Sequence, residues 1–262
     1  MNLPFFQVDA FTAEAGRGNP AGVYFLPEGP LDDAGIPEDD YLQLLAVERR
    51  LPETGFVRPR PGGYSLRWFT PRVELSLCGH GTLAAAHVLW EQGLLGPAEP
   101  ARFYTRSGLL TADLLDERWI EMDFPAFSFE PSSLPEAVMS TFASPPLGVY
   151  FAEDRYLVVL GSETEVRGYQ PDFERIKAHR LIITAPAAAP CDFVSRFFAG
   201  PLGIGEDPVT GSAHCALAPY WASRLGKTSF LAYQASARGG FLKVRLQGDR
   251  VRIAGQAITV KP

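Results

Sequence analysis

Four residues that could take part in catalysis or binding lie together at Cys78–Gly81, directly before a long apolar segment. This CGHG stretch offers a thiol and an imidazole, two groups that can exchange protons near neutral pH. Its glycines precede a run typical of a helix, and the first N–H groups of a helix have no partner inside it and carry partial positive charge. Because glycine lets a ligand approach the backbone closely, the start of this helix is a candidate anion site.

An internal repeat places a second segment of the same kind later in the chain. An offset of 132 lays CGHGTLAAAHVLW, from Cys78, over TGSAHCALAPYWA, from Thr210. The same offset lays GLLTADLLDER, from Gly108, over GFLKVRLQGDR, from Gly240, and LRWFTP resembles SRFFAG when three residues are added to the second copy. One offset that serves separate segments indicates duplication. We therefore expect two similar lobes, residues 1–125 and 126–262.

The pattern within each half predicts an α+β fold in which short strands surround one apolar helix. The first helix is expected from Leu83 to Gln92, and Gly93 follows it as the usual residue after a helix C-terminus. Since this helix is apolar on every face, it must be buried, most simply inside a wrapped sheet. The expected strands include the runs YSLRWFT, LLTADLL, WIEMDF, YLVVL, RLIIT and FLKVRL.

The second helix is expected from about Ala213 to Leu225, and Gly226 follows its end. It contains Pro219, which lacks a backbone donor and should kink or break the helix at that point. If the two halves face each other, the turns at 79–81 and 211–213 converge on one cleft suited to a small carboxylate substrate.

Composition excludes several classes of function. With 24 basic and 30 acidic residues among 262, the chain has no basic stripe for nucleic acid. No uncharged stretch is longer than Leu75–Trp90, which is shorter than the roughly 18 residues of a membrane span. Three cysteines without a CxxC pair argue against a disulfide scaffold or a zinc ribbon, and no HExxH or comparable histidine cluster suggests a metal. We expect a cytoplasmic protein without nucleic-acid or membrane partners.

Several motifs together carry a resemblance to a known family. They are GNPAGV at Gly18, PETGFV at Pro52, RWFTPRVELSLCGHGTLAAAH at Arg67 and GIGEDPVTGSAH at Gly203. The chain resembles the PhzF-like, or phenazine biosynthesis-like, isomerases, whose wider fold is that of diaminopimelate epimerase. The resemblance implies two pseudo-symmetric lobes, each a barrel-like, mostly antiparallel sheet around a central helix. It also implies a cofactor-independent isomerase that acts in the cleft between the lobes and forms a homodimer.

The resemblance also assigns roles to residues. It implies that Glu53 moves the proton, that His80 and Asp207 assist, and that Gly211 and Ser212 bind the substrate's carboxylate. From the residues alone, Glu53 lies in an apolar setting that suits a proton shuttle, although a surface carboxylate at a strand start is the alternative.

The residues leave further alternatives open. His80 could equally be a structural histidine, and Asp207 before Pro208 is also typical of a turn. Asn19 is interpreted as a turn residue that could also hold substrate or shape the site. Gly79 and Gly81 are expected to bind substrate through their backbone.

Cys78 raises the question of a different reaction. In the epimerase branch of this fold, two cysteines, one at each helix start, remove and return a proton on opposite faces of the substrate carbon. Here the repeat places Thr210 opposite Cys78, and a threonine hydroxyl is too weak an acid to replace a thiol. We interpret Cys78 as a small core residue and keep two alternatives, a racemase or epimerase that uses Cys78 and a small-acid binding protein. A dinucleotide cofactor is rejected because CGHG lacks the rest of that fingerprint.

Overall fold

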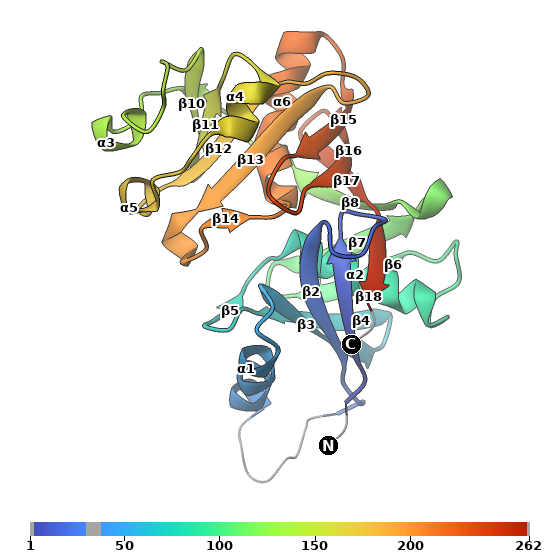
Figure 1. Cartoon of the computed structure of the whole chain (residues 1–262). Helices are drawn as coiled ribbons and strands as arrows, with labels where there is room; N and C mark the ends of the chain where they lie inside the picture. Colours follow the sequence, from blue (N-terminus) through green and yellow to red (C-terminus); the bar gives the residue numbers. More distant parts are fainter. Residues whose placement is uncertain (1–2, 30–37, 261–262) are drawn as a thin grey trace. The chain divides into compact units, whose positions relative to one another are not determined.

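The computed structural model describes residues 3–29 and 38–260, and the chain divides into two compact units. The first unit comprises Met1–Asp123 and Ala254–Pro262, and the second comprises Phe124–Ile253. The chain passes between the units within two strands, β8 (Ile120–Pro125) and β17 (Arg250–Gly255) (Figure 1). The first boundary lies close to the one expected at residue 125, whereas the C-terminal segment belongs with the first unit and not with the second.

The first unit is a mixed sheet. Strand β1 pairs antiparallel with both β2 and β18, β2 runs parallel to β3, β3 is antiparallel to β4, and β4 is parallel to β6. Strand β7 then pairs antiparallel with β6 and with β8, and the short β5 pairs with β4. The remaining strand bounds are β1 Phe5–Ala10, β2 Asn19–Phe25, β3 Glu53–Arg60, β4 Gly63–Phe69, β5 Glu74–Leu75, β6 Ala101–Thr105, β7 Gly108–Leu114 and β18 Ala257–Val260.

Helix α2 (Gly79–Glu91) is the buried helix that the sequence predicts for the first unit. Every residue from His80 to Leu89 is buried, and the helix contacts β1, β2, β3 and β18. Gly93 has a positive φ of 68° just after the end of the helix, as expected for its position. The helix begins earlier than the expected Leu83, because Cys78 caps its first turn.

The second unit repeats this order of pairings. Strand β10 is antiparallel to β11, β11 is parallel to β12, β12 is antiparallel to β13, and β13 is parallel to β15. Strand β15 is antiparallel to β16, while the short β9 and β14 pair with β10 and β13. The bounds are β9 Glu130–Pro131, β10 Gly148–Ala152, β11 Arg155–Val159, β12 Arg180–Pro186, β13 Phe193–Ala199, β14 Glu206–Asp207, β15 Ser229–Gln234 and β16 Gly240–Gln247.

The internal repeat is visible in the side chains as well as in the topology. Arg67 on β4 forms a bidentate pair with Glu74 on β5, with N–O distances of 2.7 and 2.9 Å. Arg196 on β13 forms the same pair with Glu206 on β14, at 2.7 and 2.8 Å. Each pair connects a short strand to its neighbour just before the central helix of its unit. The same kind of ion pair therefore precedes both helix starts.

Helix α6 (Gly211–Leu225) is the counterpart of α2 and is not broken by proline. Pro219 lies inside a continuous helix that ends at Gly226, whose φ is 64°. The carbonyl oxygen of Cys215, which Pro219 leaves without a helical donor, accepts the backbone N–H of Phe127 at 2.9 Å. The predicted break is therefore wrong, because a donor from outside the helix satisfies the freed carbonyl group.

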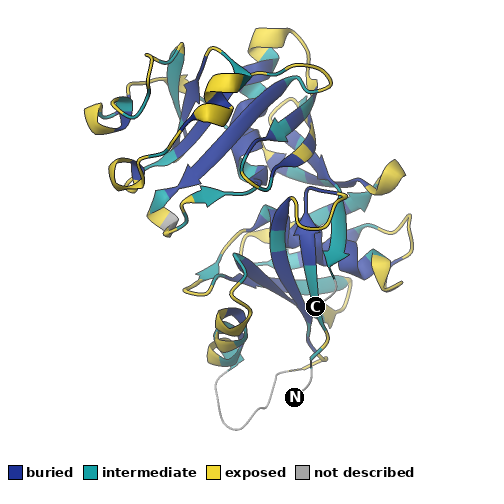
Figure 2. Ribbon diagram, viewed as in Figure 1, coloured by how far each residue is buried: buried dark blue, intermediate teal, exposed yellow. Residues whose placement is uncertain are grey.

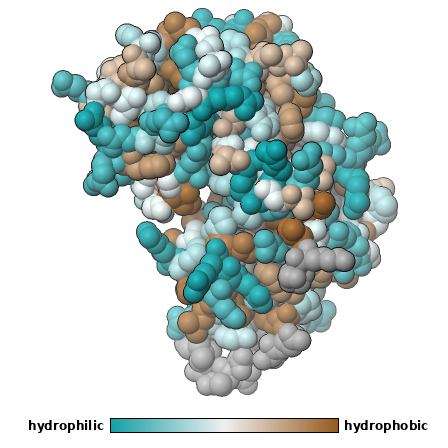
Figure 3. Space-filling view, in the orientation of Figure 1, coloured by the Kyte–Doolittle hydropathy of each residue, from teal (hydrophilic) through white to brown (hydrophobic). Residues whose placement is uncertain are grey.

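Smaller helices lie at the periphery of each unit (Figures 1 and 2). Helix α1 buries only Leu42 and Ala46, which pack on Tyr24, Phe56 and Phe69. In the described residues, no helix is long and apolar enough to span a membrane. The face shown in Figure 3 mixes hydrophilic with scattered apolar side chains. These helices are α1 Glu38–Arg49, η1 Asp116–Arg118, α3 Glu136–Met139, α4 Glu163–Gly168, α5 Phe173–Ile176 and η2 Gly200–Leu202.

Candidate active site

Glu53 and His80 meet in the interior of the first unit. Glu53 is the first residue of β3 and His80 lies in the first turn of α2, and the two side chains are only 7 and 8% exposed. Glu53 Oε2 lies 2.7 Å from His80 Nε2. Neither atom completes a well-directed hydrogen bond with another described residue. The contact therefore leaves both groups able to form a hydrogen bond with a ligand. Buried polar atoms in this condition are open to a ligand.

Cys78 is the third member of this cluster. It is the N-cap of α2, and its Sγ accepts the backbone N–H of Gly81 at 3.3 Å. The same sulfur lies 3.6 Å from His80 Nδ1. The thiol therefore caps the helix, a role usually filled by Ser, Thr, Asp or Asn, and also contacts the imidazole on the side away from Glu53.

Burial and charge oppose each other within the cluster. Burial raises the pKa of the Cys78 thiol. Burial also disfavours a charge on His80, but the neighbouring Cys78 and Glu53 outweigh this effect and raise the pKa of His80 well above its usual value. The imidazole is thus biased towards carrying a proton while the carboxylate beside it can receive one.

The same three side chains also meet the distance criterion for a metal site. One candidate ligand atom from each of Glu53, Cys78 and His80 lies within 4.8 Å of the others. However, the sulfur contacts Nδ1 whereas the carboxylate contacts Nε2. A single ion bound to one ring nitrogen of His80 cannot also bind both the Cys78 sulfur and the Glu53 carboxylate unless the imidazole rotates. The arrangement therefore suits proton transfer better than metal coordination.

The two glycines of the first turn differ in their contacts. The N–H of Gly81 is taken by Cys78, and a Cβ at Gly81 would face Trp68 and Cys78. Gly81 therefore serves packing, while the N–H groups of Gly79 and His80 have no hydrogen bond among the described residues. Asn19, fully buried, begins β2 beside β3, two residues before Ala21, which is opposite Glu53 in the parallel register.

A second group of predicted residues gathers at the start of α6. Asp207 Oδ2 accepts the hydroxyl proton of Thr210 at 2.5 Å, and Thr210 is the N-cap residue. Because that hydroxyl donates to Asp207, the Thr210 side chain does not cap the helix. Gln234 holds the turn by accepting from the Thr210 backbone N–H and donating to the Asp207 carbonyl oxygen, each at 2.8 Å. The first turn, with Gly211 and Ser212, contains no acidic residue.

Arg155 joins this second group, although nothing in its sequence neighbourhood predicts a functional role. It is the first residue of β11 and only 6% exposed, and its Nη1 donates to Ser212 Oγ at 3.0 Å. Its Nε pairs with Asp154 at 2.7 Å, and its guanidinium lies over Phe127 and Phe197, 5.4 Å from each ring centroid. In the sequence, Arg155 follows a glutamate and an aspartate and is typical of a solvated turn, so no signal marked it.

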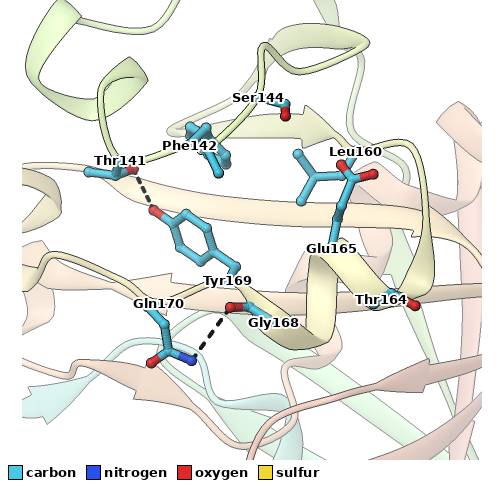
Figure 4. Close-up of a pocket in the computed structure, with 10 residues that line it drawn as sticks. Thr141, Phe142, Ser144, Leu160, Thr164, Glu165, Gly168, Tyr169 and Gln170 are labelled. Atoms are coloured by element: carbon cyan, nitrogen blue, oxygen red, sulfur yellow. Dashed lines mark hydrogen bonds between the residues drawn. The ribbon is translucent and has the colours of Figure 1, made fainter.

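A separate cavity of about 400 Å³ lies in the second unit and contains none of the predicted residues. It is lined by residues 141–144, Leu160 and the α4 region (Figure 4). Its phenol and its carboxylate are engaged within the unit, since Tyr169 and Thr141 share a 2.7 Å hydrogen bond and Glu165 interacts with Ser162. This cavity offers no unpaired acid or base and is not a candidate active site.

Comparison with known proteins identifies the family. The family model described as phenazine biosynthesis-like protein matches residues 8–262. An uncharacterized isomerase of Halalkalibacterium halodurans is 45% identical, with 99% of this chain and 97% of the relative aligned. The chain belongs to the phenazine biosynthesis-like family. The predicted family resemblance is thereby confirmed.

Solved structures confirm the fold of this family member. A PhzF family protein of Enterococcus faecalis superposes with a TM-score of 0.92 and 38% identity, covering 100% of this chain and 98% of that one. A probable proline racemase from Agrobacterium radiobacter superposes with a TM-score of 0.62 at 13% identity, covering 99% and 91%, and shares the fold. The predicted diaminopimelate epimerase-like α+β fold is confirmed.

Proposed function

We propose that this member of the phenazine biosynthesis-like family is a cofactor-independent isomerase that moves a proton within a small carboxylate substrate. The observation that carries the proposal is the buried contact between Glu53 Oε2 and His80 Nε2, in which neither atom completes a hydrogen bond. A carboxylate and an imidazole at 2.7 Å, shielded from water, can divide the roles of base and hydrogen-bond donor.

The reaction that fits these groups is a proton shift. Glu53 takes a proton from a carbon next to a carbonyl group or a double bond, and the electrons of the broken C–H bond enter the adjacent π-system. His80 Nε2–H donates to the substrate atom on which negative charge develops. Protonated Glu53 then returns the proton to another atom of the same π-system, which restores the carboxylate and leaves the double bond in a new position.

The second group supports the choice of a carboxylate substrate. The first turn of α6 has no side-chain cap and no acidic residue, and Arg155 adds a positive charge beside Ser212. A helix start and a guanidinium both favour an anion. We expect Gly211, Ser212 and Arg155 to hold the carboxylate and Asp207 to orient the substrate. That both groups serve one substrate molecule, and that the protein is a homodimer, remain predictions.

Chemistry with two cysteines receives less support from the contacts. Thr210 occupies the N-cap position that matches Cys78, and its hydroxyl donates to Asp207 at 2.5 Å. The second helix start therefore has no thiol, and the hydroxyl proton of Thr210 is already hydrogen-bonded to Asp207. Loss of activity in Cys78→Ser, together with a harmless Glu53→Gln, would favour the racemase alternative.

The test is incorporation of deuterium from D₂O. A panel of small unsaturated and amino-acid-like carboxylates is incubated with wild type, with Glu53→Gln and with Glu48→Gln, an exposed glutamate on α1 that serves as the matched control. We expect wild type and Glu48→Gln to exchange or convert a substrate, and Glu53→Gln to lose at least about a hundredfold in rate. Full turnover by Glu53→Gln would refute the role of Glu53, and binding without exchange would favour a binding protein.

A further inference from the structure

The contact between Cys78 and His80 is not used by the proton shift described above. Sγ lies 3.6 Å from Nδ1, on the side of the ring opposite to the 2.7 Å contact between Nε2 and Glu53. Both side chains are almost fully buried, so water does not compete for these positions. The ring is therefore held between two partners of different chemistry.

The second contact of the sulfur leaves the thiol proton free for His80 when the ring is neutral. The backbone N–H of Gly81 donates to Sγ at 3.3 Å, and this uses the sulfur as an acceptor. A thiol has one proton to donate. Among the described residues, Nδ1 of His80 is the acceptor that this proton reaches, so on a neutral ring the proton of the imidazole lies on Nε2.

We propose that Cys78 is a positioning residue that commits His80 to present a protonated Nε2 to Glu53 and to the substrate. The proposal rests on the proposed function, because it assigns Nε2–H a partner in the reaction. On a doubly protonated ring Nε2 is also a donor, so His80 donates from this nitrogen in both states. Glu53 is then the base of the cluster, and His80 does not compete with it for the substrate's proton.

Without Cys78, the neutral ring has no donor at Nδ1. The proton can move to Nδ1, and Nε2 then becomes an acceptor that faces a carboxylate, which is unfavourable, or the ring turns away from Glu53. Either change removes the donor that stabilises the developing charge. We expect a two- to tenfold fall in kcat for Cys78→Ala with little change in KM, the size of one ordinary hydrogen bond.

The test reads the imidazole directly by NMR. Protein labelled with ¹⁵N-histidine contains four histidines, and His80→Gln assigns the signal of interest. We expect long-range ¹H–¹⁵N spectra of wild type, at a pH where His80 is neutral, to show an unprotonated Nδ1 and a protonated Nε2. Cys78→Ala should shift the population towards Nδ1–H, and Cys78→Ser, which keeps a donor, should retain the wild-type pattern. The buried Cys215→Ala is the control and should leave His80 unchanged.

Several results would overturn the inference. They are a protonated Nδ1 in neutral wild-type His80, unchanged His80 resonances in Cys78→Ala, and an unchanged kcat despite an altered tautomer. The spectra need no substrate, so they separate this inference from the proposed function. The expected tautomer without any deuterium exchange would support the contact and count against the isomerase, whereas exchange through Glu53 with unchanged spectra would do the reverse.

Discussion

Trp68 fills the space that a side chain at Gly81 would need at the start of α2. A Cβ placed on Gly81 would be 2.8 Å from Trp68 Cδ1 and 3.0 Å from Cys78 Sγ. The absence of a side chain at Gly81 therefore allows the packing that keeps the thiol beside His80.

The substitution Gly81→Ala tests this packing. Because Trp68 is only 1% exposed and cannot move away freely, we expect a loss of about 1 to 3 kcal/mol in the free energy of unfolding, measured in urea. Gly168→Ala is the control, since no atom lies within 4 Å of its added Cβ. Equal stability of Gly81→Ala and wild type would show that the Trp68 contact is not tight.

Pro219 provides a second prediction. Replacement by alanine restores a backbone donor for Cys215, whose carbonyl oxygen can accept a second hydrogen bond beside the one from Phe127. Helix propensity favours alanine by about 3 kcal/mol, but proline restricts the unfolded chain and offsets part of this. We expect Pro219→Ala to raise the free energy of unfolding by about 1 to 2 kcal/mol in urea titrations. A loss of stability would mean that the missing helical hydrogen bond at Pro219 is needed for the contact between Cys215 and Phe127.

The buried His214 predicts a dependence of stability on pH. Burial lowers the pKa of His214 to about 4, although its Nδ1 bonds to the Thr210 carbonyl oxygen. Its pKa in the unfolded chain is the ordinary 6.5, so the unfolded state binds more protons as the pH falls from 6.5 towards 4. This group should cost about 2 kcal/mol of stability between pH 7.5 and pH 5.

Urea unfolding at those two pH values measures the effect. His214→Gln should lose about 2 kcal/mol of the pH dependence, whereas His179→Gln, on the periphery of the second unit, should keep it. An unchanged pH dependence in His214→Gln would mean that other groups produce it.

Arg155 yields a prediction about binding. Loss of a hydrogen bond from a charged donor costs about 1.5 to 3 kcal/mol, so Arg155→Met should weaken carboxylate binding at least about tenfold. The affinity for 4-fluorobenzoate can be followed by ¹⁹F NMR. Arg155→Lys should retain part of the affinity, and Arg167→Met, a half-exposed arginine of the same unit, should change little. Equal affinities for wild type and Arg155→Met would exclude Arg155 from the binding group.

Much of the fold could be predicted because local patterns and tertiary structure agree. The six strand runs fall within or overlap strands of the structure, and Gly93 and Gly226 end their helices as expected. The offset of the repeat also placed Cys78 and Thr210 at equivalent N-cap positions. These features depend on periodicity and on residues next to one another in the chain, which a sequence displays directly.

The features that could not be predicted depend on partners distant in the sequence. Phe127 precedes Cys215 by more than eighty residues, and nothing near Pro219 indicates such a donor. Arg155 becomes a buried cation only because β11 places it beside Ser212. The family resemblance implied roles for Glu53 and His80 but not the contact between them, and the thiol at Nδ1 follows from the N-cap geometry of Cys78.

The pairing of β1 with both β2 and β18 has a consequence for the order in which the protein forms during synthesis. Strand β1 emerges from the ribosome first, but one of its two neighbours, β18, is translated after the whole of the second unit. The second unit can close on its own chain as soon as it is complete, whereas the first must wait with an open edge beside β1. We therefore expect the half that is made first to finish folding last, with one edge of β1 unpaired until β18 has been made.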